Sequence, residues 1–187
     1  MERIVLASQS PRRKQLLEWA EIDFDIIVRP TEEIYPDNLA VSEVPVYIAR
    51  QKALVVQEEL SHEPIVLAAD TIVVVDMKII GKPTDRENAI AILRELSGQE
   101  HRVITGVVIR KGQKEIAFSD TTTVQFHPLT EEQIGYYVDK YKPYDKAGAY
   151  AIQEWIGVTG IKAIYGDFYN VMGLPVSRVV QALKNWV

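Results

Sequence analysis

The sequence predicts a mixed α/β fold in which a twisted sheet is flanked by helices. Short apolar runs typical of buried strands alternate with stretches of helical periodicity. The first run, residues 4–7, is followed at residues 10–11 by a capping serine and a proline, the usual signal for a helix start. Two long β-rich segments, 101–109 and 116–126, are joined around residues 111–112 in the manner of a hairpin.

The remaining elements follow from the same signals. The expected strands cover residues 4–7, 24–28, 65–69, 71–75, 78–80, 101–109 and 116–126. The expected helices begin at Ser10, Ser42, Thr84, Thr130 and Pro175. Two of these starts have the spacing of a capping box, Thr84 with Glu87 and Thr130 with Gln133. The stretch 143–170, rich in glycine and tyrosine, is expected to mix loop and strand.

Composition limits the class of protein. The chain has 187 residues, of which 47% are hydrophobic and 25% charged, with a formal net charge of −5 and no cysteine. We expect one domain, because no linker rich in proline, glycine or serine divides it. The absence of cysteine excludes disulfides and thiolate metal sites, and the acidic balance argues against a nucleic-acid partner. Neither a membrane span nor a signal peptide is recognisable, so a cytoplasmic protein is expected. His62, His101 and His127 lack metal-ligand spacing and are interpreted as structural.

The turn at residues 8–13 is the first candidate site. Ser8 and Ser10 supply hydroxyl groups, Arg12 and Arg13 supply guanidinium groups, and the helix start exposes unpaired N–H groups. Together these donors suit a polyphosphate. The alternative is an ordinary helix start with solvated arginines, although cations at this end oppose the helix dipole.

Asp70 is the second candidate. It follows an apolar run and is expected where that strand emerges, at the kind of strand end where open α/β sheets bind ligands. A carboxylate there can hold a divalent cation or accept a proton from water. The alternative is an aspartate that only ends a strand in a turn.

Several other polar residues allow either a functional or a solvent-exposed interpretation. Lys52 lies in the middle of a helix, where a lysine is usually exposed to solvent. Lys82 lies in a tight Gly-Lys-Pro connection and could face a phosphate or only solvent. The loop acids Glu32 and Glu33 could complete a cation site with Asp70 or remain solvated.

The segment 145–154 is unusual for its small residues, which let the backbone approach a neighbour closely. Gln153 offers both a donor and an acceptor and could match the edge of a pyrimidine. The alternative is a tightly packed strand with a surface amide.

Seven blocks in order along the chain resemble the signature blocks of the Maf proteins. They are residues 8–13 (Ser-Gln-Ser-Pro-Arg-Arg), 69–71 (Ala-Asp-Thr), 81–83 (Gly-Lys-Pro), 97–98 (Ser-Gly), 101–107 (His-Arg-Val-Ile-Thr-Gly-Val), 145–150 (Asp-Lys-Ala-Gly-Ala-Tyr) and 170–175 (Asn-Val-Met-Gly-Leu-Pro). The resemblance covers essentially the whole chain. It implies a nucleoside triphosphate pyrophosphatase with the two-lobed, inosine-triphosphatase-like fold and its substrate in a central cleft.

The resemblance also implies roles for individual residues. Asp70 matches the family's proton acceptor. The phosphate-facing set comprises Ser8, Ser10, Arg12, Arg13, Lys52 and Lys82. Arg12 or Arg13, Thr71 and Gln153 match the branch that prefers dTTP and UTP. Asp70 and Glu33 would hold a divalent cation, Mg²⁺ or Mn²⁺, with Glu32 as the alternative acid.

Several choices stay open. Asp70 could be the base, a metal ligand or both. The competing class of function is a nucleotide-binding regulator of septum formation and cell division without turnover. The expected partner is a small nucleoside triphosphate, and a homodimer is compatible with the sequence.

Overall fold

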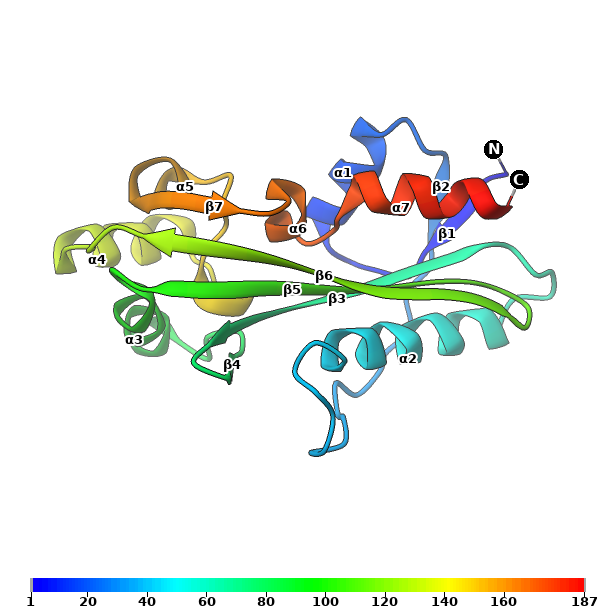
Figure 1. The fold of residues 1–187 in the computed structure, drawn as a ribbon, viewed down its shortest axis with the longest axis horizontal. Coiled ribbons are helices and arrows are strands. Elements are labelled where there is room, and N and C mark those ends of the chain that lie inside the picture. Colours follow the sequence, from blue (N-terminus) through cyan, green and yellow to red (C-terminus); the bar gives the residue numbers. More distant parts are fainter. Residues whose placement is uncertain (1, 187) are drawn as a thin grey trace. The chain divides into compact units, whose positions relative to one another are not determined.

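The sheet contains both parallel and antiparallel strands. The computed structural model of the protein describes residues 2–186. Its seven strands run in the order β2-β1-β3-β5-β6-β7, with β4 paired to β3 (Figure 1). The pairs β1–β2 and β1–β3 are parallel, whereas β3–β4 and β6–β7 are antiparallel. The predicted mixed sheet flanked by helices is therefore confirmed.

The strands are β1 (Ile4–Leu6), β2 (Phe24–Ile26), β3 (Val66–Val75), β4 (Lys78–Ile80), β5 (Glu100–Lys111), β6 (Lys114–Phe126) and β7 (Ile161–Tyr165). The helices are α1 (Pro11–Trp19), α2 (Val44–Glu58), α3 (Arg86–Leu96), α4 (Glu131–Tyr141), α5 (Trp155–Gly160), α6 (Phe168–Met172) and α7 (Val176–Leu183). Two short 3₁₀ turns, Ala147–Ala149 and Lys184–Trp186, complete the described chain. No helix among residues 2–186 is both long and apolar enough to cross a membrane.

The chain divides into two compact units. Unit 1 comprises the residues up to Thr71, 105–120 and those from Gly173 on. Unit 2 comprises residues 72–104 and 121–172. Strands β3, β5 and β6 each contribute residues to both units.

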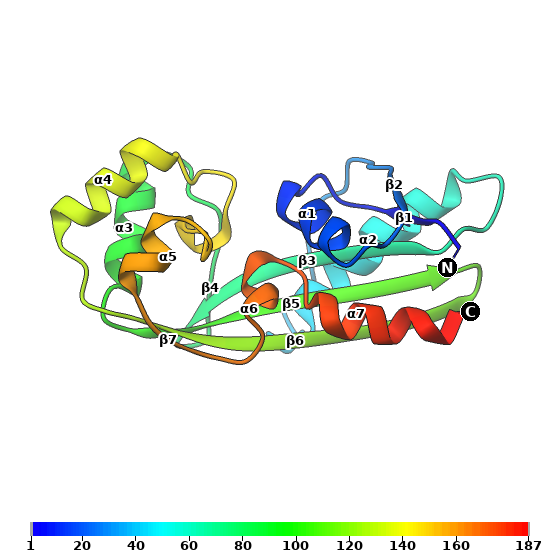
Figure 2. The ribbon, with the colours of Figure 1, turned by 90° about the horizontal axis from the view of Figure 1, so that it is seen from above.

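In unit 1, the core forms where α2 covers the sheet. Ala49, Ala53 and Val56 of α2 pack against Val66 and Ala68 of β3, together with residues of β1 and β5. In Figure 1, α2 lies on one side of these strands, and α1 and α7 lie on the other. Helix α7 runs along the first part of β6 (Figure 2), where Arg178 Nη1 donates to the Ser119 carbonyl at 2.8 Å.

The main correction concerns β3. Two strands with Asp70 at an exit were predicted, but a single strand runs without a break through Asp70 and Thr71. Asp70 is therefore in the middle of the strand. Aspartate is depleted in strands, which favoured a break at this position. Here the aspartate is buried, and it is tolerated because a lysine of α2 pairs with it.

Helix starts were predicted with mixed success. Ser10 caps α1 and the Thr130–Gln133 capping box opens α4, as predicted. Helix α3 is capped by Asp85 rather than by Thr84, since Asp85 Oδ1 accepts the Asn88 N–H at 2.8 Å. Ser42 does not cap α2, which begins two residues later without a side-chain cap.

The last third of the chain holds more helix than expected. The stretch 143–170 contains α5 and the start of α6 beside the single strand β7. These helices have six and five residues, too few for a clear helical period in the sequence. Pro175 is the capping residue of α7 rather than its first helical residue.

Candidate functional site

The start of α1 gathers the first group of predicted residues. Ser10 is the helix cap, and its side chain accepts the Arg13 N–H at 3.4 Å. Ser8 Oγ accepts the Ser10 N–H at 3.3 Å and Arg13 Nη1 at 3.1 Å. Both hydroxyls therefore shape the turn, in the way that the Ser-x-Ser-Pro pattern predicts.

Arg13 is buried and joins three segments of unit 1. Besides Ser8, its guanidinium donates from Nε to the Gly173 carbonyl at 2.7 Å and from Nη2 to Thr71 Oγ1 at 3.0 Å. Burial lowers the pKa of Arg13, and the negative charge of Asp70 opposes this effect. Arg12, the next residue toward the N-terminus, is only half-buried.

Thr71 connects this turn to a second strand. Its hydroxyl lies 2.9 Å from the Thr105 hydroxyl of β5 and 3.4 Å from the Gly173 carbonyl. Gly173 has a φ of 118°, a conformation that L side chains rarely adopt. The contacts of Thr71 with Thr105 and of Arg13 with Gly173 could not be predicted, because these residues are far apart along the chain.

Asp70, Lys52 and Glu33 form the second group. Lys52 Nζ lies 2.7 Å from Asp70 Oδ1 and 3.0 Å from Glu33 Oε1. The Lys52 side chain is 19% exposed and that of Asp70 is 12% exposed, whereas Glu33 is 48% exposed. Lys52 thus differs from the usual solvent-exposed lysine in the middle of a helix, and its phosphate contact, implied by the family resemblance, stays a prediction. Of the two loop acids, Glu33 is the one whose carboxylate is observed to reach Lys52.

Strand alternation explains why the two groups meet at β3. Successive side chains of a strand point to opposite faces. Val66 and Ala68 pack toward α2, so Asp70 faces α2 and meets Lys52. Thr71 points to the other face and meets Arg13 of α1. The structure thus brings the turn at residues 8–13 and the pair Asp70–Thr71 together within unit 1.

The carboxylates of Asp70 and Glu33 converge on one cationic group, the ammonium of Lys52. Within residues 2–186, no cluster of three or more histidine, cysteine, aspartate or glutamate side chains is arranged to hold a metal ion. Two carboxylates nevertheless fit Mg²⁺, which proteins commonly hold through one or two carboxylates together with substrate phosphates. The donor set therefore fits a divalent cation that is shared with a phosphorylated ligand.

In unit 2, a hydrogen bond joins the turn that contains Lys82 to the segment 145–154, which contains Gln153. The Gly148 N–H donates to the Gly81 carbonyl at 3.2 Å, so the Gly-Lys-Pro turn is bonded to the small-residue segment. Lys82 and Gln153 are both exposed. Gln153 lies in a turn closed by the Glu154 N–H and the Ala151 carbonyl at 3.1 Å, not in the packed strand considered as the alternative.

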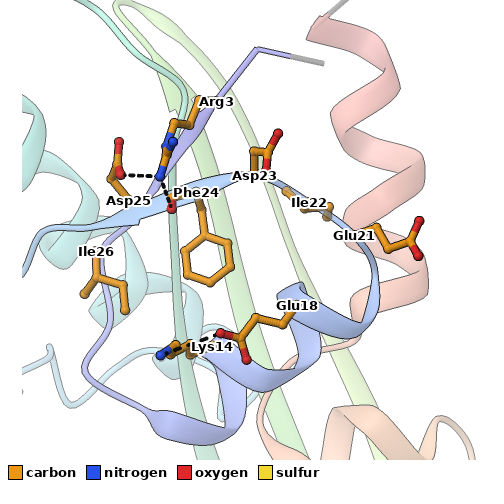
Figure 3. Close-up of a pocket in the computed structure, with 9 residues that line it drawn as sticks. All are labelled: Arg3, Lys14, Glu18, Glu21, Ile22, Asp23, Phe24, Asp25 and Ile26. Atoms are coloured by element: carbon orange, nitrogen blue, oxygen red, sulfur yellow. Dashed lines mark hydrogen bonds and ion pairs between the residues drawn. The ribbon is translucent and has the colours of Figure 1, made fainter.

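A pocket of about 570 Å³ lies elsewhere on unit 1, beside β2 (Figure 3). The Phe24 ring points into it, between the Arg3–Asp25 ion pair at 2.8 Å and the Lys14–Glu18 pair at 3.6 Å. None of the predicted site residues lines this pocket. Both of its basic side chains already pair with acids of the same lining, so the pocket is less suited to a polyphosphate than the Asp70 group.

Comparisons with known proteins agree with the resemblance in the sequence. Residues 3–186 match the model of the family described as Maf-like protein. A Parabacteroides distasonis protein named dTTP/UTP pyrophosphatase is 49% identical over 98% of this chain and 96% of its own. A Cytophaga hutchinsonii protein of the same name is 52% identical over 97% of this chain and 83% of its own.

Among solved structures, a HAM1 protein from Coxiella burnetii has a TM-score of 0.47 and 17% identity, covering 67% of this chain and 73% of that one. This likeness is too low to bear on the function. The family match and the relatives each extend over nearly the full length of the chain. The chain therefore belongs to the family of Maf-like proteins.

Proposed function

We propose that this protein hydrolyses dTTP and UTP to the nucleoside monophosphate and pyrophosphate. The observation that carries the proposal is the Asp70 carboxylate, buried beside Lys52 and next in the chain to the Arg13-bound Thr71. A carboxylate can accept a proton from water, and the neighbouring cations suit a polyphosphate. The full-length relatives named dTTP/UTP pyrophosphatase support the same substrates.

In the proposed reaction, Asp70 orients the attacking water and accepts its proton. The water oxygen forms a bond to the α-phosphorus as the bond from this phosphorus to the oxygen bridging the β-phosphate breaks, and pyrophosphate leaves with the electron pair and the negative charge. Lys52 is held between Asp70 and Glu33, and an incoming polyphosphate competes with both acids for its ammonium. Substrate binding would thereby free Asp70 to contact water and place Lys52 against the developing charge.

The other predicted residues bind the substrate. Ser8, Ser10 and Arg12 contact phosphate at the start of α1, where unpaired N–H groups favour anions. Arg13 orients Ser8 and Thr71, and its own phosphate contact stays a prediction. Lys82 contributes a further cation, while Thr71 and Gln153 recognise the uracil or thymine edge.

Asp70 and Glu33 would hold the divalent cation, either Mg²⁺ or Mn²⁺. When bound, the cation would neutralise phosphate charge and polarise the bond that breaks. Asp70 has two competing roles, because a carboxylate that binds a metal directly is a weaker base. Turnover measured with either metal, or with a chelator, tests whether the reaction requires the cation. The requirement for Asp70 is tested separately by a variant.

The test is pyrophosphate release from a panel of pyrimidine and purine triphosphates, with Asp70→Asn as the variant. The wild type should release pyrophosphate fastest from dTTP and UTP. Asp70→Asn should fold normally, since asparagine is nearly isosteric, but lose at least about a hundredfold in kcat because general-base catalysis is lost. Near-normal turnover by a folded Asp70→Asn protein would contradict the role of Asp70.

Product analysis completes the test. Release of phosphate alone would identify a phosphatase that removes the terminal group. Tight nucleotide binding with no turnover under any metal condition would favour the alternative of a regulatory nucleotide-binding protein.

A further inference from the structure

The turn that carries Gln153 is fixed by its own backbone and by a buried neighbour. Residues 151–154 form a turn closed by the hydrogen bond from the Glu154 N–H to the Ala151 carbonyl. Ile152 is 4% exposed and anchors the turn in the core, whereas Gln153 next to it is exposed. The backbone of this turn therefore sets where the Gln153 amide is presented.

Tyr137 of α4 holds both ends of this turn through one phenol oxygen. It accepts the Ala151 N–H at 3.1 Å and donates to the Glu154 carboxylate. Tyr137 is 0% exposed, and its bond to the Ala151 N–H is buried, so water does not compete for that bond. The bonded residues, 151 and 154, flank Gln153 on both sides.

Lys146 balances the charge of this network. Its Nζ lies 2.8 Å from Asp145 Oδ1 and 3.7 Å from Glu154 Oε1. The Lys146 side chain is buried, and a buried ammonium is stable only when it is paired. Lys146 thus ties the beginning of the segment to the end of the turn.

The same segment contains backbone that needs external support. Gly148 and the buried Ala149 have φ values of 73° and 57°. Such a conformation is unfavourable for alanine and persists where surrounding contacts impose it. The Gly148 N–H bond to the Gly81 carbonyl and the network around Glu154 provide such contacts.

We propose that Tyr137 is a positioning residue for base recognition, acting through Ala151 and Glu154 on the orientation of Gln153. This inference rests on the proposed function, in which Gln153 reads the pyrimidine. An amide distinguishes bases only when its donor and acceptor meet the base edge at a fixed angle. Loosening the turn should therefore reduce the preference for pyrimidines more than it reduces turnover itself.

The experiment measures kcat/KM for dTTP, UTP, dATP and GTP, and compares pyrimidine-to-purine ratios. Gln153→Ala should lower the ratio about tenfold or more. Tyr137→Phe should lower it about three- to tenfold, the effect of one lost hydrogen bond. Tyr141→Phe is the matched control. It also removes a phenol hydroxyl from α4, but from the neighbouring ring that stacks on Tyr137. The control should change the ratio less than about twofold.

A double variant tests whether Tyr137 acts through Gln153. If it does, adding Tyr137→Phe to Gln153→Ala should leave the ratio at the value of Gln153→Ala alone. A merely structural role would instead lower kcat/KM for all four substrates alike and keep the ratio. That second result in a folded protein would overturn the proposal.

Variants of Glu154 test the same inference if Tyr137→Phe fails to fold. Glu154→Ala should lower the ratio, whereas Glu154→Gln, which retains an acceptor for the phenol, should restore most of it. Equal ratios for these two variants would contradict the inference.

The failure of the proposed function can be distinguished from the failure of the inference. If the wild type releases no pyrophosphate from any substrate, the proposed function and the inference both fail. If the wild type prefers pyrimidines but the Tyr137 and Glu154 variants keep its ratio, only the inference fails.

Discussion

Arg13 and Lys52 reach β3 from opposite faces of the sheet, and each meets one of two consecutive residues. Lys52 pairs with Asp70, and Arg13 bonds to Thr71. The two cations have different partners. Lys52 lies between two carboxylates that can separate from it, whereas Arg13 is bound to neutral acceptors in a buried site. We therefore expect Lys52 to exchange partners during turnover and Arg13 to stay in place.

Replacement of Arg13 by lysine should destabilise the protein. A single ammonium cannot reproduce the planar fork that reaches Ser8, Thr71 and the Gly173 carbonyl together. The loss of buried hydrogen bonds from a charged donor should lower the free energy of unfolding by about 2–3 kcal/mol, measured by urea denaturation. Arg12→Lys, at the half-buried neighbour, should change it by less than about 1 kcal/mol. Equal losses for both variants would contradict the positioning role of Arg13.

Part of this arrangement could be predicted from the sequence. Arg13 is spaced three and four residues from Leu16 and Leu17, so it falls on the buried face of α1. Lys52 continues the buried series of Ala49 and Val56 on α2 in the same way. The general preference of lysine for solvent argued against this position, and only the family resemblance placed Lys52 in the phosphate-facing set. The partner of each cation could not be predicted, because it depends on the register of β3 between two helices.

At the scale of elements, the position of α2 depends on a close contact with β5. A Cβ atom added at Gly106 would lie 2.2 Å from the Val46 nitrogen and 2.3 Å from the Pro45 carbonyl carbon. Both are backbone atoms at the start of α2, so no side-chain rotation can relieve the overlap. Gly106 thus sets how closely α2 approaches the sheet. The same helix carries Lys52 toward Asp70.

Gly106→Ala should therefore lower both stability and activity. We expect the free energy of unfolding to fall by about 3 kcal/mol, because α2 must move away from β5. Turnover of dTTP should fall as well, since this movement displaces Lys52. Gly135→Ala in α4 is the matched control, as its added Cβ would meet no atom within 4 Å. The free energy of unfolding of that variant should rise by about 0.5–1 kcal/mol, because alanine has a higher helix propensity than glycine. A Gly106→Ala protein as stable as the wild type would show that α2 packs differently.

The elements also show where local signals are sufficient. Ser10 and the Thr130–Gln133 pair were recognised as caps because each lies directly before an apolar helical period. At the start of α3, Thr84 and Asp85 are both capping residues in adjacent positions, and the sequence pattern selected the wrong one. The continuity of β3 through Asp70 depends on the ion pair with Lys52, a tertiary contact that no local pattern contains.

At the scale of the whole molecule, the two units share strands. Because β3, β5 and β6 contribute residues to both, unfolding of one unit removes strands from the other. We therefore expect a single cooperative unfolding transition, in which a change in the core of unit 2 alters the stability of the entire chain.

His101 is such a core residue in unit 2. It is 2% exposed, its Nε2 lies 2.6 Å from the Tyr150 hydroxyl, and its ring stacks on Phe126 at 5.5 Å. Its Nδ1 is buried without a hydrogen-bond partner. Burial lowers the pKa of His101 from 6.5 to about 4. The folded protein therefore keeps the ring neutral under conditions where the unfolded chain protonates it.

This difference predicts the direction of the pH dependence. Between pH 6.5 and 4 the unfolded state binds more protons than the folded state, so stability falls as the pH is lowered through this range. The stability associated with a neutral His101 should be fully present above pH 6.5, and about 3 kcal/mol of it should be lost by pH 4. His101→Gln should remove this part of the slope in urea unfolding at a series of pH values. His127→Gln, which replaces an exposed histidine, should retain this part of the slope because the buried His101 is unchanged. Parallel curves for the wild type and His101→Gln would show that protonation of His101 is not linked to folding.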